Sequence, residues 1–259
     1  MVELADDPSH ASSGARAEGP RAEAPRQARA LATRGAILAA AAEEFAAGSY
    51  HEASLSRILE RSNVTKGALY FHFVSKESIA LAVVDEMELV CRAMVERCRA
   101  LDLDPLRTAA QLARAMQDEL DGPVLRAGQR LCSEGFTGPH RPGWPYRFWQ
   151  DVFVDLFGRA ATAGLLRPWA DPTSLARTVV DLSGGAFVAS LAISGLDDLA
   201  QRVCENWELL LGAAADPAWL DTWRHDGGMG AVLGPHLARR RDAPAVEPIT
   251  GDGGWVPES

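Results

Sequence analysis

Lysine is almost absent from this sequence. Of its 26 basic residues, only Lys66 and Lys76 are lysines, and both lie between residues 25 and 76. That block holds seven basic and four acidic residues, whereas residues 1–24 have a net charge of −3 and residues 77–259 have one of −9. A small basic module on an acidic body indicates that a polyanion such as nucleic acid binds one end of the chain, despite the overall charge of −9.

Cysteine is also scarce, and long apolar runs are missing. The four cysteines are Cys91, Cys98, Cys132 and Cys204. They form no CxxC pair and no zinc-binding pattern, so neither a disulfide framework nor a metal site is predicted. No secretory signal is recognisable, which favours free thiols in a reducing cytoplasm. The most apolar stretch, residues 178–196, contains Asp181 and a Ser-Gly-Gly break, so we expect a buried helix and no membrane partner.

Motifs of the common enzyme classes do not occur. The chain has no GxSxG, HExxH, P-loop or GxGxxG pattern, and its six histidines lack the spacing of a metal site. The apolar fraction of 47% is sufficient for a hydrophobic core. We therefore expect a folded protein that is not an enzyme and needs no cofactor. An enzyme built on a helical bundle is the alternative from another class.

Apolar residues recur at helical spacing through most of the chain, and no alternating strand pattern appears, which predicts an all-α fold. Helices are expected from about 30 to 47, from Ser54, from Thr65, and over 75–101, 104–120, 123–134, 146–163, 172–194 and 197–214, with a short one after 216. We divide the chain into a disordered extension (1–29), a DNA-binding domain (30–76), a ligand-binding and dimerisation domain (77–224) and a flexible tail (225–259).

Residues 54–73, SLSRILERSNVTKGALYFHF, fit two short helices joined by a tight turn, a helix-turn-helix. Small residues at the start of the second helix allow close approach to DNA, and its terminal amides attract phosphate. The candidate DNA-binding residues are Ser54, Thr65, Lys66, Gly67, Tyr70, His72 and Lys76. Arg26, Arg29 and Arg34 are expected near the duplex backbone. Short capped helices are common, however, and Phe71 and Phe73 are expected to close a small core.

The segment TKGALYFHF with the following SKE, within residues 65–77, resembles the recognition helix of TetR-type transcriptional regulators, and in particular the γ-butyrolactone-receptor branch of actinomycetes. GPVLRAGQRL (122–131) and PYRFWQDVF (145–153) resemble the same branch. The resemblance covers about residues 30–215. It implies three DNA-binding helices, a helical ligand-binding and dimerisation domain, and a homodimer that reads a pseudo-palindrome.

A ligand pocket and a dimer interface follow from this resemblance. Apolar walls with a few polar groups suit an amphipathic ligand, and the tryptophan that matches Trp149 lines the cavity of that branch. The pocket candidates are Trp149, Thr178, Gln129, Val152, Phe153 and Leu125. The interface candidates, on the last two long helices, are Gly184, Ala189, Val203, Trp207 and Leu210. Core packing is the alternative role for Trp149, Thr178, Gln129 and Trp207.

The leading hypothesis is a repressor that binds operator DNA as a dimer and is released by a γ-butyrolactone-like, furan or butenolide signal. Its targets would be genes of secondary metabolism, and it would be cytoplasmic, associated with the nucleoid when bound to DNA. The alternatives are a pseudo-receptor that responds to an antibiotic or an intermediate, and a DNA-binding protein that needs no ligand.

Overall fold

The computed structural model describes residues 20–136 and 143–238, with side chains described from residue 26 onward. Within these ranges the chain is helical. The helices are α1 (Pro20–Ala47), α2 (Leu55–Ser62), α3 (Lys66–His72), α4 (Lys76–Arg99), α5 (Pro105–Leu120), α6 (Pro123–Ser133), α7 (Tyr146–Thr162), α8 (Pro172–Ser194), α9 (Leu199–Ala214), α10 (Pro217–His225) and α11 (Gly228–Ala238). The predicted all-α class is confirmed, and most helix boundaries agree within two residues.

Capping side chains define the helix starts. In α3, the Thr65 hydroxyl accepts a hydrogen bond from the amide of Ala68 at 3.2 Å. In α4, Ser75 and Ser78 each accept from the other's amide at 3.1 Å, which makes a capping box. Helices α5, α8 and α10 begin with an aspartate that accepts amide hydrogen bonds, followed by a proline at the first helical position.

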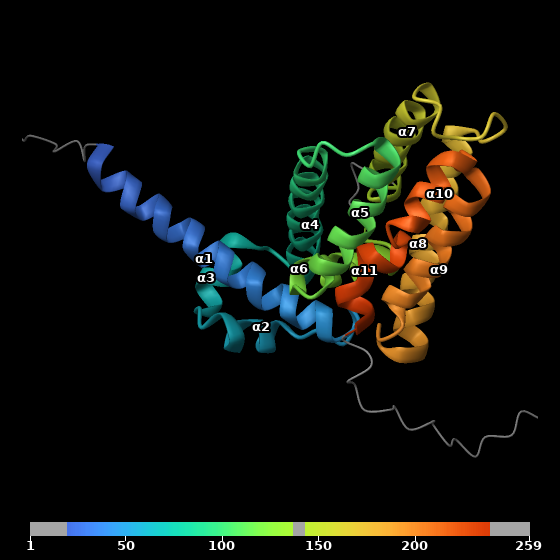
Figure 1. Ribbon diagram of the computed structural model, residues 1–259. Coiled ribbons are helices and arrows are strands. Elements are labelled where there is room, and N and C mark those ends of the chain that lie inside the picture. The colour runs from blue at the N-terminus through green and yellow to red at the C-terminus, as the bar shows by residue number, and fades with distance from the viewer. Residues whose placement is uncertain (1–19, 137–142, 239–259) are drawn as a thin grey trace, which may run out of the picture.

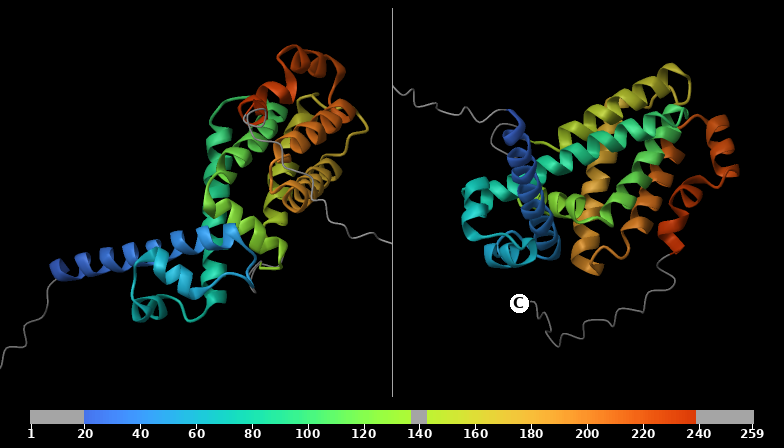
Figure 2. Two further views of the ribbon diagram at one scale, coloured as in Figure 1. Left: turned by 90° about the horizontal axis from the view of Figure 1, so that it is seen from below. Right: turned by 90° about the vertical axis from the view of Figure 1, so that its left-hand side faces the viewer.

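The first helix starts ten residues earlier than expected. We predicted disorder for 1–29, yet α1 begins at Pro20, and residues 1–19 lie outside the described residues. At 28 residues α1 is about 40 Å long, and its N-terminal part projects beyond the rest of the domain (Figures 1 and 2). The prediction failed because it counted large apolar residues, whereas alanine, arginine and glutamate favour a helix without them.

The expected flexible tail also contains a helix. α11 packs against α5 and α9 and buries Met229, Val232 and Leu233. The ring of His236 lies 2.8 Å from the Asp118 carboxylate of α5, which fixes the end of α11 to the body. Glycines at 227, 228, 230 and 234 hid this apolar pattern. The part of the tail from residue 239 onward lies outside the described residues.

The helix-turn-helix lies at one end of the molecule and the larger helical body at the other (Figure 1). Helices α1 to α3 pack together, and α4 extends from them into the body, where it contacts α5 and α6. α8 is long and apolar enough to cross a membrane by composition alone, and it packs against α7 and α9. α6 contacts both α1 and α4, so it joins the two parts.

The crossing of α4 and α6 is unusually close. A Cβ atom added at Gly128 of α6 would lie 2.5 Å from the Met87 sulfur and 2.7 Å from the Met87 Cβ. No side chain larger than hydrogen fits there unless α4 and α6 separate. Gly128 therefore sets the distance between the helix that leaves the DNA-binding domain and the helix that borders the body's cavity.

Candidate functional site

The turn between α2 and α3 has the geometry of a helix-turn-helix. α2 ends at Asn63, which adopts the left-handed conformation (φ 51°), a conformation that asparagine tolerates better than most residues. α3 then begins after the cap Thr65. The side chain of Leu69 is fully buried and anchors α3 against the domain.

One face of α3 is open to solvent. Thr65, Lys66, Gly67 and Tyr70 are all exposed, as a surface that meets DNA requires. A Cβ added at Gly67 would meet no atom within 4 Å, and its φ is not in the left-handed region. Nothing within the described fold therefore demands glycine at this position, which favours the close approach of a partner as the reason for its small size. His72 is half-buried at the end of the helix.

The expected roles of the two phenylalanines differ in the structure. Phe73 is buried as predicted, whereas Phe71 is 81% exposed, so its predicted place in the core is wrong. Leu69 and Phe73 are four residues apart and share the inner face of this segment, which turns Phe71 outward. With Val74, which is 84% exposed, Phe71 adds apolar surface beside the recognition helix.

Lys76 faces the protein instead of a phosphate. Its ammonium group donates hydrogen bonds to the carbonyls of Tyr50 at 2.8 Å and Ala53 at 3.0 Å, and it lies 4.3 Å from the centre of the Tyr50 ring. These contacts hold the loop between α1 and α2. Its predicted DNA contact is therefore corrected to a role in positioning the helix-turn-helix. Ser54 likewise caps α2 and is half-buried.

Glu44 is a residue that sequence reasoning missed. Its side chain is 3% exposed, and its carboxylate accepts hydrogen bonds from the Ser54 amide at 3.1 Å and from Arg57. Arg61 lies 3.7 Å from the same carboxylate. This network ties α1 to the start of α2. The available signal was an acid inside an apolar helical stripe, between Ala41 and Phe45.

The arginines of α1 divide into two groups. Arg26 and Arg29 are exposed on the projecting part. Arg34 lies 3.5 Å from Glu86 of α4 and 5.5 Å from the Phe73 ring, so it braces the domain. Arg26 and Arg29 remain candidates for the duplex backbone because both are exposed.

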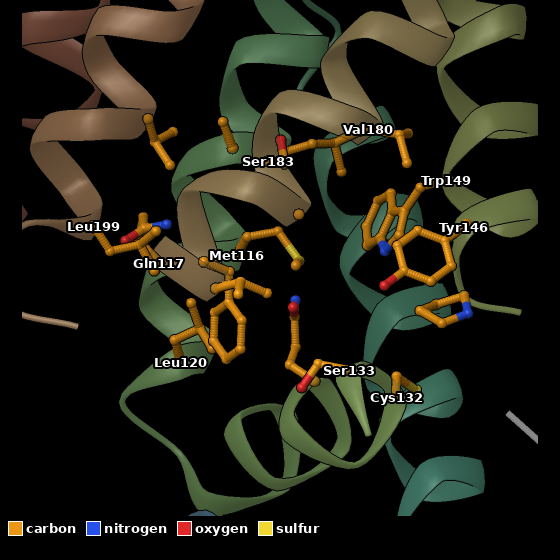
Figure 3. A pocket seen from close by; sticks show the side chains of 18 of the residues that line it. Met116, Gln117, Leu120, Cys132, Ser133, Tyr146, Trp149, Val180, Ser183 and Leu199 are labelled. Carbon is orange, nitrogen blue, oxygen red and sulfur yellow. The ribbon is translucent and has the colours of Figure 1, made fainter. Parts of the chain in front are cut away.

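The body contains a cavity of about 110 Å³ that is lined by residues of α5, α6, α7, α8 and α9 and is partly open to solvent (Figure 3). Apolar residues form most of its wall. These are Leu112, Ala113, Met116, Leu120, Cys132, Pro145, Phe153, Val180, Gly184, Phe187, Val188, Leu199, Val203 and Trp207. The polar groups are Gln117, Gln129, Ser133, Tyr146, Ser183 and the indole of Trp149. Among the described residues, no acidic, basic or histidine side chain lines the cavity.

Three of the six pocket candidates border this cavity: Trp149, Gln129 and Phe153. Leu125 and Val152 are buried in the surrounding core but do not line it. Thr178 is exposed, and its hydroxyl donates to the Ser174 carbonyl at 2.9 Å, so its predicted place in the pocket is wrong. Ser183 lies five residues further along α8, on the side that borders the cavity. Gln117 was missed, although it interrupts the apolar stripe of α5.

The apolar stripe of α9 faces inward. Val203, Trp207 and Leu210 are buried, and the Trp207 and Phe153 ring centres lie 5.9 Å apart. These residues are core, so their predicted place at the surface of a dimer interface is corrected, and Gly184 also lines the cavity. The sequence pattern predicts the apolar stripe of α9, but it does not show which part of the molecule packs against that stripe.

The outer face of α8 and α9 offers a different apolar surface. Ala189 borders a groove between the two helices, together with Leu182 and Gly185. The large exposed apolar side chains on this face are Leu182, Ile193 and Leu209. The dimer surface is therefore expected on these outer positions.

Two buried thiols, Cys91 and Cys132, have low reactivity. Burial raises the pKa of Cys91 on α4 to about 12, and burial does the same for Cys132 on α6. The Cys132 thiol donates to the Phe136 carbonyl at 3.4 Å. Both thiols stay protonated at neutral pH and act as apolar packing groups.

Comparison with known proteins identifies relatives. Residues 37–83 match the family of bacterial regulatory proteins named tetR. The chain is 37% identical over 194 residues to the A-factor receptor protein of Streptomyces griseus, covering 74% of this chain and 67% of that protein. A crystal structure of an ArpA-like γ-butyrolactone receptor superposes with a TM-score of 0.65 at 26% identity, covering 83% of this chain and all of that one. CprB of Streptomyces coelicolor, solved with its biological operator sequence, gives a TM-score of 0.65 at 27% identity, covering 78% and 97%.

Proposed function

The chain belongs to the TetR family of bacterial regulatory proteins, close to the γ-butyrolactone receptors, and from that premise we propose that it represses genes of secondary metabolism until an uncharged γ-butyrolactone-like signal releases it from its operator. It is a DNA-binding transcriptional regulator and not an enzyme. The observation that carries the ligand proposal is the cavity beside Trp149, whose described lining is mostly apolar and carries no charge. Its place of action is the cytoplasm, on the nucleoid when bound to DNA.

On the DNA side, the exposed face of α3 enters the major groove. Lys66 meets a phosphate, Tyr70 and His72 offer polar groups to the backbone, and Thr65 with Gly67 allows the helix to approach. One such helix reads only a half-site, so two copies must present α3 about one DNA turn apart and read a pseudo-palindrome. The outer face of α8 and α9 is the surface that joins the two copies.

The chemistry of the cavity separates the candidate ligands. A charged group buried there would find no opposite charge among the described lining residues, which is strongly unfavourable. A lactone, furan or butenolide with an alkyl chain needs only apolar walls and a few hydrogen bonds. A charged antibiotic or intermediate, as expected for a pseudo-receptor, fits less well. A DNA-binding protein without a ligand has no use for such a cavity.

The size of the cavity supports a physical route for release. A cavity of about 150 Å³ holds benzene, so a lactone with an alkyl chain needs more room than the present 110 Å³. Such a ligand favours a conformation in which the surrounding helices lie further apart. By reciprocity, operator DNA that favours the present conformation weakens ligand binding by the same factor.

Helix α6 is positioned to carry this expansion to the DNA-binding domain. Its Gln129, Cys132 and Ser133 line the cavity, and its body packs on α1 and α4. Directly after it, the Glu134 carboxylate accepts a hydrogen bond from the Tyr50 amide at 2.9 Å, and the Phe136 ring lies 4.3 Å from the Tyr50 ring. A shift of α6 therefore pulls on the loop that leads into α2.

The test is a gel-shift titration of the operator complex with a γ-butyrolactone that carries a six-carbon alkyl chain. We expect this lactone to release the parent protein and the Trp169→Ala control, whose indole is 65% exposed. Trp149→Ala is expected to stay on DNA. Because truncating a buried tryptophan can cost about 3–5 kcal/mol, the variant is first shown to be folded and dimeric.

Two outcomes would contradict the proposal. Release of Trp149→Ala at the parent's lactone concentration would make Trp149 a packing residue. Failure of the parent to respond to any lactone, combined with release by a charged antibiotic, would support the pseudo-receptor instead.

A further inference from the structure

Gln117 of α5 is a buried amide without a partner. Its side chain is only 8% exposed, yet it forms no hydrogen bond with any other residue that the structure describes. It borders the cavity, where its neighbours Met116 and Leu120 are apolar. The amide atoms are not sealed inside the protein but keep accessible surface at the cavity, so the side chain has an unused capacity to donate and to accept there.

The position of Gln117 matters more than its burial. Figure 3 shows Gln117 beside Leu199 on one side of the cavity, whereas Trp149 and Tyr146 lie on the opposite side. The cavity therefore has polar groups at both ends, with Met116 and Val180 among the apolar walls between them. Gln129, Ser133 and Ser183 are further polar residues of the lining. A ligand that spans it meets two separate polar points.

The helix that carries Gln117 is held in place on its outer side. The neighbouring residue, Asp118, contacts the buried ring of His236 on α11 at 2.8 Å. This contact opposes a rotation of α5 that would carry the Gln117 amide out to water. The amide is thus kept against the cavity although nothing in the described part of the protein satisfies it.

We propose that Gln117 recognises a hydroxyl or carbonyl oxygen on the chain of the ligand, at the end distant from the ring that packs against Trp149. This inference rests on the proposed function and narrows it: the signal is an uncharged molecule with polar groups at both ends, not a lactone with a plain alkyl chain. Gln117 is then the residue that distinguishes an oxygenated chain from an alkyl chain. A primary amide suits this task because it serves either a hydroxyl or a ketone.

The experiment compares two lactones on three proteins. The first lactone carries an unbranched six-carbon chain, and the second is the same molecule with a hydroxyl at the chain end. Dissociation constants are measured by tryptophan fluorescence for the parent, for Gln117→Leu and for Gln201→Leu, a control at an exposed position of α9. We expect the parent and the control to bind the hydroxylated lactone about tenfold more tightly, which corresponds to about 1.4 kcal/mol.

Gln117→Leu is expected to lose this preference, chiefly by binding the plain lactone more tightly, and to be at least as stable as the parent because an unpaired amide is gone. Gln117→Met, an unbranched side chain, repeats the measurement if the leucine variant does not remain folded. An equal affinity of the parent for both lactones, or a preference that persists in both variants, overturns the inference.

A second pair of probes separates this inference from the proposed function. 1-Hexanol and 1,6-hexanediol contain no lactone and differ by one terminal hydroxyl, and their binding is followed by the shift in melting temperature. A larger shift with the diol in the parent, absent in Gln117→Leu, supports the role of Gln117 even if neither lactone binds. In that case the proposal of a lactone ligand is wrong, whereas the proposed role of Gln117 is supported. Equal shifts with both alcohols in the parent count against Gln117.

Discussion

In the helix-turn-helix, capping hydroxyls and a buried carboxylate hold the elements together, whereas in the body apolar side chains pack around a cavity without charge. Glu44 and Lys76 each join two segments of the DNA-binding end through charged hydrogen bonds. In the body, the rings of Phe153 on α7 and Trp207 on α9 pack against each other and so join two helices. The first region should therefore be sensitive to charge and salt, and the second to volume.

The strongest test of the first region is Glu44→Leu. It leaves the Ser54 amide and the Arg57 Nε–H without their acceptor and removes the ion pair with Arg61, so we expect a loss of about 3 kcal/mol in the free energy of unfolding. Operator affinity should fall with it, because the start of α2 is no longer fixed. Glu43→Gln is the matched control: Glu43 pairs with Arg61 at the surface, and its loss should cost at most about 1 kcal/mol. Urea denaturation measures both, and equal losses would contradict the structural role of Glu44.

The corresponding test of volume is Gly128→Ala at the crossing of α4 and α6. The added methyl group overlaps Met87, so we expect a loss of about 1–2 kcal/mol in the free energy of unfolding. Gly158→Ala in α7 is the control, because its added methyl group meets no atom within 4 Å and it should stabilise by up to about 1 kcal/mol. Met87→Ala removes the overlap but also a buried side chain, so the loss in the double variant should be smaller than the sum of the two single losses. If Gly128→Ala is as stable as the parent, α4 and α6 can move apart at this crossing at little energetic cost.

The two lysines sharpen the comparison within the DNA-binding end. Lys66→Ala should weaken operator binding and lower the slope of log affinity against log salt by about one unit, because one phosphate contact is lost. It should leave the free energy of unfolding within about 0.5 kcal/mol of the parent. Lys76→Met should destabilise the loop between α1 and α2 but leave the slope unchanged. If instead Lys76→Met lowers the salt slope and Lys66→Ala lowers the free energy of unfolding, the roles assigned to the two lysines are reversed.

The smallest effect concerns two buried thiols, of which Cys132 lines the cavity and Cys91 lies on α4. Burial raises the pKa of Cys91 and Cys132 to about 12. Because these folded-state values exceed the unfolded value of about 8.5, the folded protein holds the protons more tightly, and stability should decline as pH rises from about 8.5 toward 12. At pH 8 a thiol reagent should modify the half-buried Cys204 first. Rapid modification of Cys132 would show instead that the cavity opens readily to solvent.

The sequence was sufficient for features that neighbouring residues determine. Ser54, Thr65 and Ser75 define helix starts through contacts two or three residues away, so the helix-turn-helix could be predicted almost to the residue. The resemblance to known receptors placed Trp149 at the cavity. Features that depend on distant neighbours could not be predicted. Lys76 turns inward because the carbonyls of Tyr50 and Ala53 lie beside it, which only the folded chain reveals.

Rotation about a helix axis explains the remaining errors. A stripe of apolar residues on α9 was evident, but whether it faces a second copy or the protein's own core depends on how α9 sits against α7 and α8. Val203 and Trp207 face the core. On α8 a similar uncertainty placed Thr178 in the pocket instead of Ser183. Gln117 went unnoticed because a glutamine in a helix is ordinary until its surroundings are known.

The prolines at the start of four body helices affect how the ligand specificity of such a receptor can change in evolution. α5, α6, α8 and α10 each begin at a proline, so their boundaries are set by residues outside the cavity. The side chains that line the cavity have little part in defining the helices that carry them. Mutations can therefore exchange one lining residue for another while the scaffold persists, and natural selection can retune the signal without rebuilding the receptor.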